Sequence, residues 1–126
     1  MRCPCRKKSE TTSYTACCQP YHTGSRPAPT AEALMRSRYS AFALRNAAYL
    51  LATWHPTTRP TSLDLDDDDG EWVQLRVLAA EVDGDTATVS FIARSRNGGH
   101  VTSLHEVSRF VREDGRWLYV DGVRGD

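Results

Sequence analysis

The chain has 126 residues, with 16 basic and 16 acidic side chains, and 40% of its residues are hydrophobic. This length and composition fit one domain with a small appendage and exclude wholesale disorder. The balanced charge argues against a chain that binds nucleic acid or an anionic membrane through a strong overall basic charge. The sequence has neither an apolar run long enough to span a membrane nor an apolar secretory signal after Met1, so we expect a cytoplasmic protein without a membrane partner.

All four cysteines lie within the first 18 residues, and residues 1–24 contain no Leu, Ile or Val. Such a segment cannot build a hydrophobic core, so something else must order it. The spacing suits tetrahedral coordination of one Zn²⁺ by four thiolates, those of Cys3, Cys5, Cys17 and Cys18. A fully ligated site of this kind is structural, because it leaves no open position for a substrate. The alternatives that stay open are a pair of disulfides, which the cytosol disfavours, free thiols, a redox role, and a site in which His22 replaces one thiolate.

A Pro-rich connector at residues 24–29 follows this segment. It predicts a boundary between a zinc-binding knuckle over residues 1–24 and a larger domain over residues 25–126. Because the connector carries few apolar residues, we expect the two parts to fold independently.

A helical segment begins after the connector. Thr30 is a suitable N-cap, and the spacing of apolar residues predicts helix over residues 31–53. Asn46 indicates a break between two helices. Pro56 and Pro60 end the helical segment, since proline lacks the amide proton that a helix interior needs.

From Trp72 onward the apolar residues alternate, which is typical of strands. Asp-Gly and Asn-Gly pairs mark the turns between the strands. After a first strand that starts at Trp72, the predicted strands cover residues 86–94, 101–112 and 117–120, with turns at Asp83-Gly84, Asn97-Gly98-Gly99 and Asp114-Gly115. Helices grouped before an antiparallel meander of four strands predict an α+β fold.

The residues also carry a family resemblance. The cysteine pattern followed by YHTG resembles a SEC-C motif, a small zinc-binding element also found at the end of the SecA translocation ATPase. The strings AEALMRSRYSAF, YLLATWHPTTRP and HEVSRFVREDGRWLYVDG resemble the YchJ-type family of uncharacterised bacterial proteins over nearly the whole chain. The resemblance implies a nuclear-transport-factor-two-like (cystatin-like) cone, in which helices pack on a curved four-stranded antiparallel sheet. It also implies the four cysteines as zinc ligands, although their intervening loop is longer and lacks the family's glycine turn.

Cones of this type often hold a ligand between helix and sheet, and the family strings supply polar candidates for such a pocket. These are Arg36, Arg38, Tyr39, His55, Arg59, Glu106, Arg109 and Tyr119. Strand alternation puts Glu106 on the same face as Phe110, which should face the core, and opposite to Arg109. We therefore expect the Glu106 carboxylate inside the cone, paired with the helix that carries Arg38 and Tyr39, because a buried charge needs a partner. A packed cone without a ligand, in which these side chains are structural, stays open as the alternative.

The leading hypothesis is a zinc-binding protein whose knuckle binds a protein partner. The alternative is an enzyme, a hydrolase or isomerase, or a small-molecule binder that uses a pocket in the cone. Nucleic-acid contact through Arg2, Arg6, Lys7 and Lys8 is a weaker alternative, and we do not expect a nucleic-acid partner. The acidic run at residues 66–69 lacks the spaced ligands of a calcium loop and is expected to be solvated.

Overall fold

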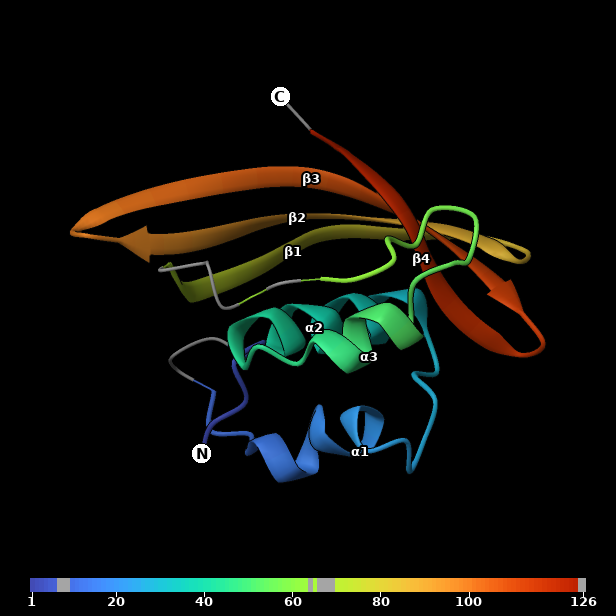
Figure 1. Ribbon diagram of the computed structural model, residues 1–126, viewed down its shortest axis with the longest axis horizontal. Coiled ribbons are helices and arrows are strands. Elements are labelled where there is room, and N and C mark those ends of the chain that lie inside the picture. Colours follow the sequence, from blue (N-terminus) through green and yellow to red (C-terminus); the bar gives the residue numbers. More distant parts are fainter. Residues whose placement is uncertain (7–9, 64, 66–69, 125–126) are drawn as a thin grey trace.

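The computed structural model describes residues 1–6, 10–63, 65 and 70–124. Lys7, Lys8 and the acidic run at residues 66–69 lie outside the described residues. A 3-10 helix (Tyr14–Ala16) and α1 (Gln19–His22) precede α2 (Ala31–Ala43) and α3 (Ala47–Ala52). Four strands follow: β1 (Glu71–Asp83), β2 (Thr86–Asn97), β3 (His100–Glu113) and β4 (Arg116–Arg124). The N-terminal segment with α1, the pair α2 and α3, and the sheet form three successive layers (Figure 1).

The helix boundaries follow from local capping. The Thr30 hydroxyl accepts a hydrogen bond from the backbone N–H of Ala33 at 3.0 Å, which starts α2 as predicted. The predicted break at Asn46 is confirmed: its side-chain oxygen accepts from the N–H of Tyr49 at 3.1 Å and starts α3. None of the described helices is long and apolar enough to cross a membrane.

The sheet is an antiparallel meander in the order β1-β2-β3-β4, so the predicted α+β class is confirmed. The strands run further than the apolar alternation indicated, to Asn97 in β2 and to Arg124 in β4. Backbone pairing continues past the buried stretch because it depends on peptide groups and not on apolar side chains. Asp114 (φ 53°) and Gly115 (φ 77°) both take the left-handed conformation that the tight turn between β3 and β4 requires.

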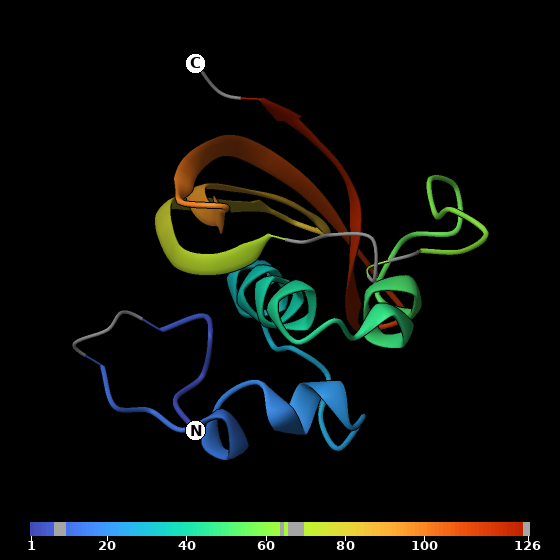
Figure 2. The ribbon, with the colours of Figure 1, turned by 60° about the vertical axis from the view of Figure 1, so that its left-hand side comes forward.

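The sheet bends over α2, with α3 beside that helix (Figure 2). Irregularities in the strand register lie between Val77 and Ala79 in β1 and between Arg109 and Phe110 in β3. Such bulges kink a strand and increase its twist, which favours the concave shape of the predicted cone. The core between helix and sheet includes Leu34, Leu50, Val89 and Phe110, each no more than 1% exposed.

The segment after α3 joins the edge of the sheet. Trp54 forms a parallel bridge with Tyr119 of β4. The N–H of His55 donates to the Tyr119 carbonyl at 2.7 Å, and the N–H of Tyr119 donates to the Thr53 carbonyl at 2.8 Å. These bonds place the Trp54 and Tyr119 rings next to each other, with centroids 5.1 Å apart.

Candidate functional site

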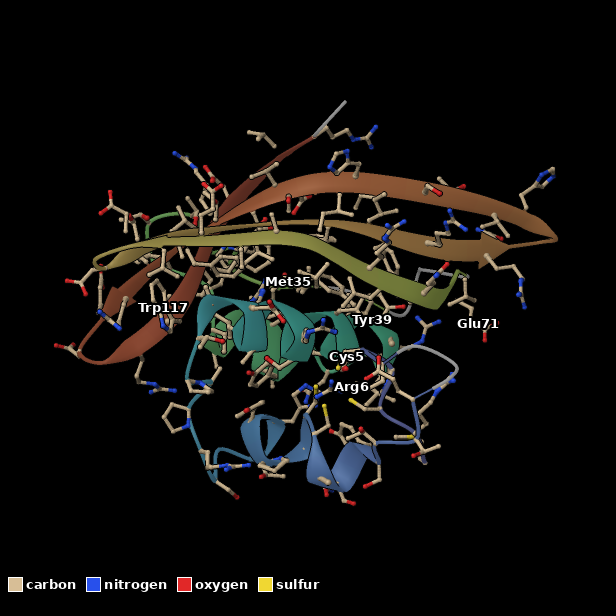
Figure 3. All side chains as sticks on the ribbon, turned by 180° about the vertical axis from the view of Figure 1, so that it is seen from behind. Cys5, Arg6, Met35, Tyr39, Glu71 and Trp117 are labelled. Carbon is tan, nitrogen blue, oxygen red and sulfur yellow. The ribbon has the colours of Figure 1, made fainter. Side chains whose placement is uncertain are left out.

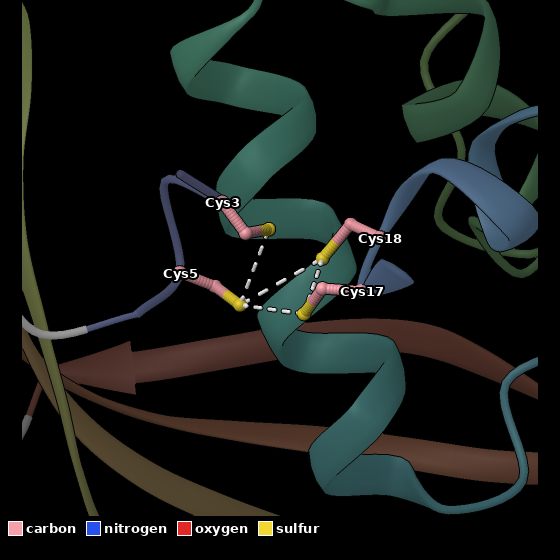
Figure 4. A group of neighbouring side chains, drawn as sticks. All are labelled: Cys3, Cys5, Cys17 and Cys18. Atoms are coloured by element: carbon pink, nitrogen blue, oxygen red, sulfur yellow. Dashed lines mark hydrogen bonds between the residues drawn. The ribbon is translucent and has the colours of Figure 1, made fainter. Parts of the chain in front are cut away.

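The four cysteine sulfurs converge beside α2 (Figure 4). The Cys5 sulfur lies 3.6 Å from that of Cys3, 3.6 Å from that of Cys17 and 3.7 Å from that of Cys18. The Cys17 and Cys18 sulfurs are 3.9 Å apart. Four sulfurs placed tetrahedrally about 2.3 Å from a zinc ion lie about 3.8 Å from one another, so the cluster fits that ion. All four cysteines are free, and their separations are well beyond the roughly 2.05 Å of a disulfide bond.

The surroundings of the cluster suit negative charge. Cys3, Cys5 and Cys18 are at most 1% exposed, so their sulfurs are shielded from water. The Arg6 Nε donates a hydrogen bond to the Cys17 sulfur at 3.4 Å, and the Ser40 hydroxyl lies 3.4 Å from the Cys3 sulfur. Four thiolates around one Zn²⁺ carry a net charge of minus two, which such donors offset.

His22 does not join the cluster. Its Nδ1 lies 2.7 Å from the Tyr14 hydroxyl, and its Nε2 lies 2.7 Å from the Ser37 carbonyl oxygen. Both ring nitrogens are therefore engaged, and the alternative in which His22 replaces a thiolate has no support in this geometry. The ring instead connects α1 to α2.

Hydrogen bonds within the cluster give its thiol groups different pKa values when no metal is bound. Hydrogen bonds from Cys18 and Cys5 lower the pKa of Cys3. Hydrogen bonding with Cys3 and Cys5, together with burial, raises the pKa of Cys18. Neighbouring thiols cannot all ionise unless a cation compensates their charge, so binding of a divalent metal would displace protons from this site.

The knuckle packs directly on α2. Besides the Ser37 and Ser40 contacts, Arg36 donates from Nη1 to the Cys5 carbonyl at 3.1 Å. Cys5 and Arg6 lie on the side of α2 away from the sheet, whereas Met35 and Tyr39 lie between α2 and the sheet (Figure 3). These contacts argue against independent folding of the two parts. The connector has few apolar residues, but the knuckle is joined to the larger domain through α2 and not through the connector. The boundary between residues 24 and 25 stays a prediction.

A cavity of about 180 Å³ lies on the other side of α2, under the sheet. Most of its lining is aromatic or aliphatic, including Trp72, Phe91 and Phe110. The polar lining comes from Arg38, Tyr39, Trp54, Glu106, Ser108 and Tyr119. Four of the predicted pocket residues, Arg38, Tyr39, Glu106 and Tyr119, are thus brought together here.

Arg38 is a buried cation, only 5% exposed. Its Nη1 donates to the Leu50 carbonyl at 2.8 Å and to the Thr53 hydroxyl at 2.7 Å. Its guanidinium carbon lies 5.0 Å from the centre of the Trp54 ring and 4.4 Å from that of the Tyr119 ring. Burial lowers the pKa of Arg38 to about 10, which still leaves the group charged at neutral pH. Among the described carboxylates, none forms an ion pair with it.

Glu106 points into the cone, as predicted. Its Oε2 accepts a hydrogen bond from the Ser108 hydroxyl at 2.7 Å, and its side chain lies directly over Gly122. The predicted partner on α2 is absent within the described residues, because Ser108 on the same strand takes that place. Cation and carboxylate therefore share one cavity without forming an ion pair.

Two of the residues that line the cavity carry a buried donor without an acceptor. The Tyr39 hydroxyl and the Trp54 indole N–H have no hydrogen-bond partner in the described part of the chain. Burial raises the pKa of Tyr39 to about 12, so its hydroxyl keeps its proton at neutral pH. Unsatisfied buried donors are uncommon in native proteins and call for an explanation.

His55 and Arg59, two further predicted pocket residues, do not line this cavity. His55 turns its Nε2 to Glu113, at 2.7 Å, and its Nδ1 to Thr57, because its backbone is tied to the edge strand β4. Arg59 is exposed in the loop that follows.

Arg109 and Arg36 also lie elsewhere. Arg109 is on the outer face of the sheet, as its alternation with Glu106 requires, and its Nε donates to Asp121 at 2.6 Å. Arg36 faces the knuckle and pairs with Glu32 at 3.1 Å. Both belong to surface ion pairs and not to the cavity.

Trp54, Trp72 and Ser108 were not among the predicted pocket residues. Strand alternation was a usable indication for Ser108, which shares its face with Glu106. No local pattern indicated Trp54, because its place depends on a bridge to Tyr119, far away in the sequence.

Helices under a bent four-stranded meander, with a four-cysteine cluster at the N-terminus, define an NTF2-like α+β protein with a SEC-C-like knuckle. Residues 30–122 match the family described as "YchJ, middle NTF2-like domain", and the chain belongs to this family.

Relatives and solved structures agree with this assignment. A UPF0225 protein of Bordetella pertussis is 51% identical, covering 95% of this chain and 90% of its own length. A UPF0225 protein of Streptomyces coelicolor is 52% identical, covering 95% and 93%. The solution structure of a SEC-C motif containing protein from Rhodopseudomonas palustris is similar with a TM-score of 0.83 and 38% identity, over 94% of this chain and 96% of that one. The crystal structure of a SEC-C motif containing protein from Psychrobacter arcticus gives 0.80 and 31%, over 98% and 82%.

Proposed function

We propose that this protein binds a small molecule in the cavity between α2 and the sheet, and that its cysteine cluster is a structural zinc site that supports α2. The observation that carries the proposal is the Arg38 guanidinium, which is buried against an aromatic cavity and has no carboxylate partner among the described residues. A buried charge without an ion-pair partner is costly to stability, and such groups cluster at functional sites.

The cavity volume supports binding over complete packing. A single water needs roughly 10–15 Å³ of such space, so about 180 Å³ holds a molecule of several heavy atoms. The two residues with unsatisfied donors, Tyr39 and Trp54, are among its lining residues. Mostly apolar walls with a few convergent polar groups are typical of small-molecule sites.

The sulfur geometry supports zinc as the metal of the cluster. Soft thiolates in a tetrahedral arrangement select zinc over hard cations such as Mg²⁺ or Ca²⁺. A site with four protein ligands has no vacancy for substrate, so its role is to hold the knuckle and α2 together. Free thiolates require a reducing compartment, and we therefore propose a cytoplasmic location.

The three tryptophans give a direct test of the cavity. Trp54 and Trp72 line it, whereas Trp117 is buried elsewhere and serves as an internal control. In the full chain, a fragment library should contain compounds that shift the indole N–H resonances of Trp54 and Trp72 but not that of Trp117. Ala93→Leu, which fills space in the lining, should abolish those shifts. A library whose binders all leave Trp54 and Trp72 unmoved would show that the cavity is not a binding site.

The metal is tested separately. Protein purified without added metal should contain about one zinc per chain, with X-ray absorption reporting sulfur ligands at about 2.3 Å. A folded protein with four reactive thiols and no metal would contradict the structural zinc site.

A protein partner for the knuckle is the second candidate. A shallow hollow of about 120 Å³ lies beside Cys17 and is lined by three arginines, Arg6, Arg26 and Arg36. This hollow suits an acidic side chain of a partner. A partner that co-purifies with the wild-type chain should be lost with Arg26→Glu and retained with Arg109→Glu on the outer face of the sheet. Equal retention by both variants would remove the hollow as the contact. An enzymatic use of the cavity stays a prediction.

A further inference from the structure

The polar groups of the cavity specify what kind of ligand it takes. Three of the residues that line it, Arg38, Tyr39 and Trp54, carry donors without an acceptor among the described residues. Two of the three guanidinium nitrogens of Arg38, Nε and Nη2, donate to none of the described residues, because both of its hydrogen bonds leave from Nη1. The Tyr39 hydroxyl and the Trp54 N–H are two further donors without acceptors.

A set of unused donors that includes a fixed positive charge calls for an anionic acceptor. Guanidinium groups bind carboxylates through two parallel N–H···O bonds, and such charge-assisted bonds are stronger than neutral ones. A neutral acceptor would add nothing to the attraction that Glu106 already exerts on the buried charge of Arg38, whereas an anionic acceptor would pair with it directly. The donor set therefore favours a carboxylate.

Glu106 sets a second requirement. Its carboxylate lines the same cavity, accepts from Ser108, and has no cation paired with it among the described residues. A ligand with a carboxylate alone would bring a second negative charge next to it. A ligand that also presents a hydroxyl or amine to Glu106 turns this repulsion into a hydrogen bond.

The walls set a third requirement. Trp72, Phe91 and Phe110 offer flat apolar surface between the polar groups. On the basis of the proposed function of this cavity, we infer that its ligand is a small monocarboxylic acid with a flat apolar body and a hydrogen-bond donor away from the carboxylate.

Four probes separate these requirements in the full-length zinc-loaded protein. They are 3-hydroxybenzoate and 4-hydroxybenzoate, which meet all three, benzoate, which lacks the donor, and 4-hydroxybenzyl alcohol, which lacks the charge. Affinity is measured from the indole resonances of Trp54 and Trp72, with Trp117 as the internal control. We expect the better hydroxybenzoate to bind about tenfold more tightly than either benzoate or the alcohol, as the loss of one charge-assisted bond predicts.

The variants assign the selectivity to residues. Glu106→Gln should raise the affinity for benzoate and reduce its disadvantage relative to the hydroxybenzoate, whereas a purely structural Glu106 would change both affinities equally. Arg38→Lys should weaken both acids more than the alcohol, because lysine keeps the charge but loses the planar fork. Arg109→Gln, on the outer face of the sheet, is the control and should change neither affinity.

The outcomes separate this inference from the proposed function. Binding of the alcohol at the Trp54 and Trp72 resonances with no preference for the acids would overturn the inference and leave a small-molecule site in place. Equal effects of Glu106→Gln on benzoate and hydroxybenzoate would overturn the role of the donor. No shift at these resonances with any probe or library compound would overturn both proposals.

Discussion

A single added methyl group at Gly122 should test how tightly Glu106 is held. Gly122 lies in β4, paired with Ser108 of β3, and its backbone does not take the left-handed conformation that would by itself disfavour alanine. A β-carbon built there would lie 2.5 Å from the carboxyl carbon of Glu106 and 2.9 Å from its Cγ. Carbon atoms need about 3.5 Å, so the Glu106 side chain must move by roughly 1 Å.

The expected cost follows from that displacement. Overpacking of this size destabilises a protein by about 1–3 kcal/mol, and the lower half of this range applies because Glu106 can swing into the adjoining cavity. The swing breaks the Ser108 hydrogen bond to a charged acceptor, which is worth about 1.5–3 kcal/mol. Replacing glycine by alanine also stabilises the protein by about 0.4–1 kcal/mol, because it reduces the conformational entropy of the unfolded chain. The net expectation for Gly122→Ala is a loss of about 3 kcal/mol.

A double-mutant cycle isolates the contact. Gly122→Ala is measured by urea unfolding in the wild-type chain and in the Glu106→Ala background, where the colliding atoms are gone. In that background the same substitution should be neutral or slightly stabilising, which gives a coupling of about 3 kcal/mol between the two positions. An equal loss in both backgrounds would refute the reasoning, since it would mean that the β-carbon disturbs the strand and not Glu106.

Three further predictions concern the metal and the helix beneath the cavity. Removal of the metal by a strong chelator should reduce the hydrogen-exchange protection of α2 around Ser37 and Ser40 more than that of β2, because the described knuckle residues bond to α2 at these two serines. Protons compete with the metal for the thiolates, so acidification should release zinc. Arg6→Gln should move this release to higher pH, because it removes the hydrogen-bond donor to the Cys17 sulfur. A chromophoric zinc indicator measures the release, and identical release curves for the wild-type chain and the variant would contradict this role of Arg6. Tyr39→Phe should stabilise the ligand-free protein by up to about 1 kcal/mol, since it removes a buried hydroxyl without a partner. The folded pKa of Tyr39, about 12, lies above the unfolded value of about 10, so the stability that the protonated hydroxyl contributes is complete below pH 10 and is lost as pH rises through 12. Tyr39→Phe should therefore reduce the loss of stability in that window, which urea unfolding at a series of pH values would measure.

The order of elements was predictable because local chemistry controls it. Asn46 caps α3 and Asp114-Gly115 makes its turn through contacts within a few residues. The inward orientation of Glu106 was predictable for the same reason, since alternation along a strand fixes which face a side chain takes. The same rule predicts that Arg109 lies on the opposite face of the sheet. Arg109 was a pocket candidate only because it lies in a string that resembles the family.

The makeup of the candidate site depended on contacts that no local pattern records. Trp54 lines the cavity because the chain after α3 bridges to Tyr119 on the edge strand, and the same bridge turns His55 toward Glu113. The surface of α2 on which the knuckle packs could not be predicted from a local pattern either. Ser37 and Ser40 are polar and suggest a solvated face of the helix, yet both are 0% exposed.

The burial of these two serines shows how the cavity and the cysteine cluster depend on one helix. The Ser37 hydroxyl donates to the Leu34 carbonyl at 2.7 Å, so its own helix satisfies it. For Ser40, the hydroxyl's partner within the described chain is the Cys3 sulfur, so its burial is favourable only while the knuckle is in place. Arg38 and Tyr39 lie between these serines in sequence and turn to the cavity instead. Loss of the metal would therefore leave a polar face of α2 without its cover and loosen the helix that positions the cationic and hydroxyl donors. Binding at the proposed zinc site and at the proposed ligand site is thus expected to be coupled through α2, although the two sites lie on opposite sides of it.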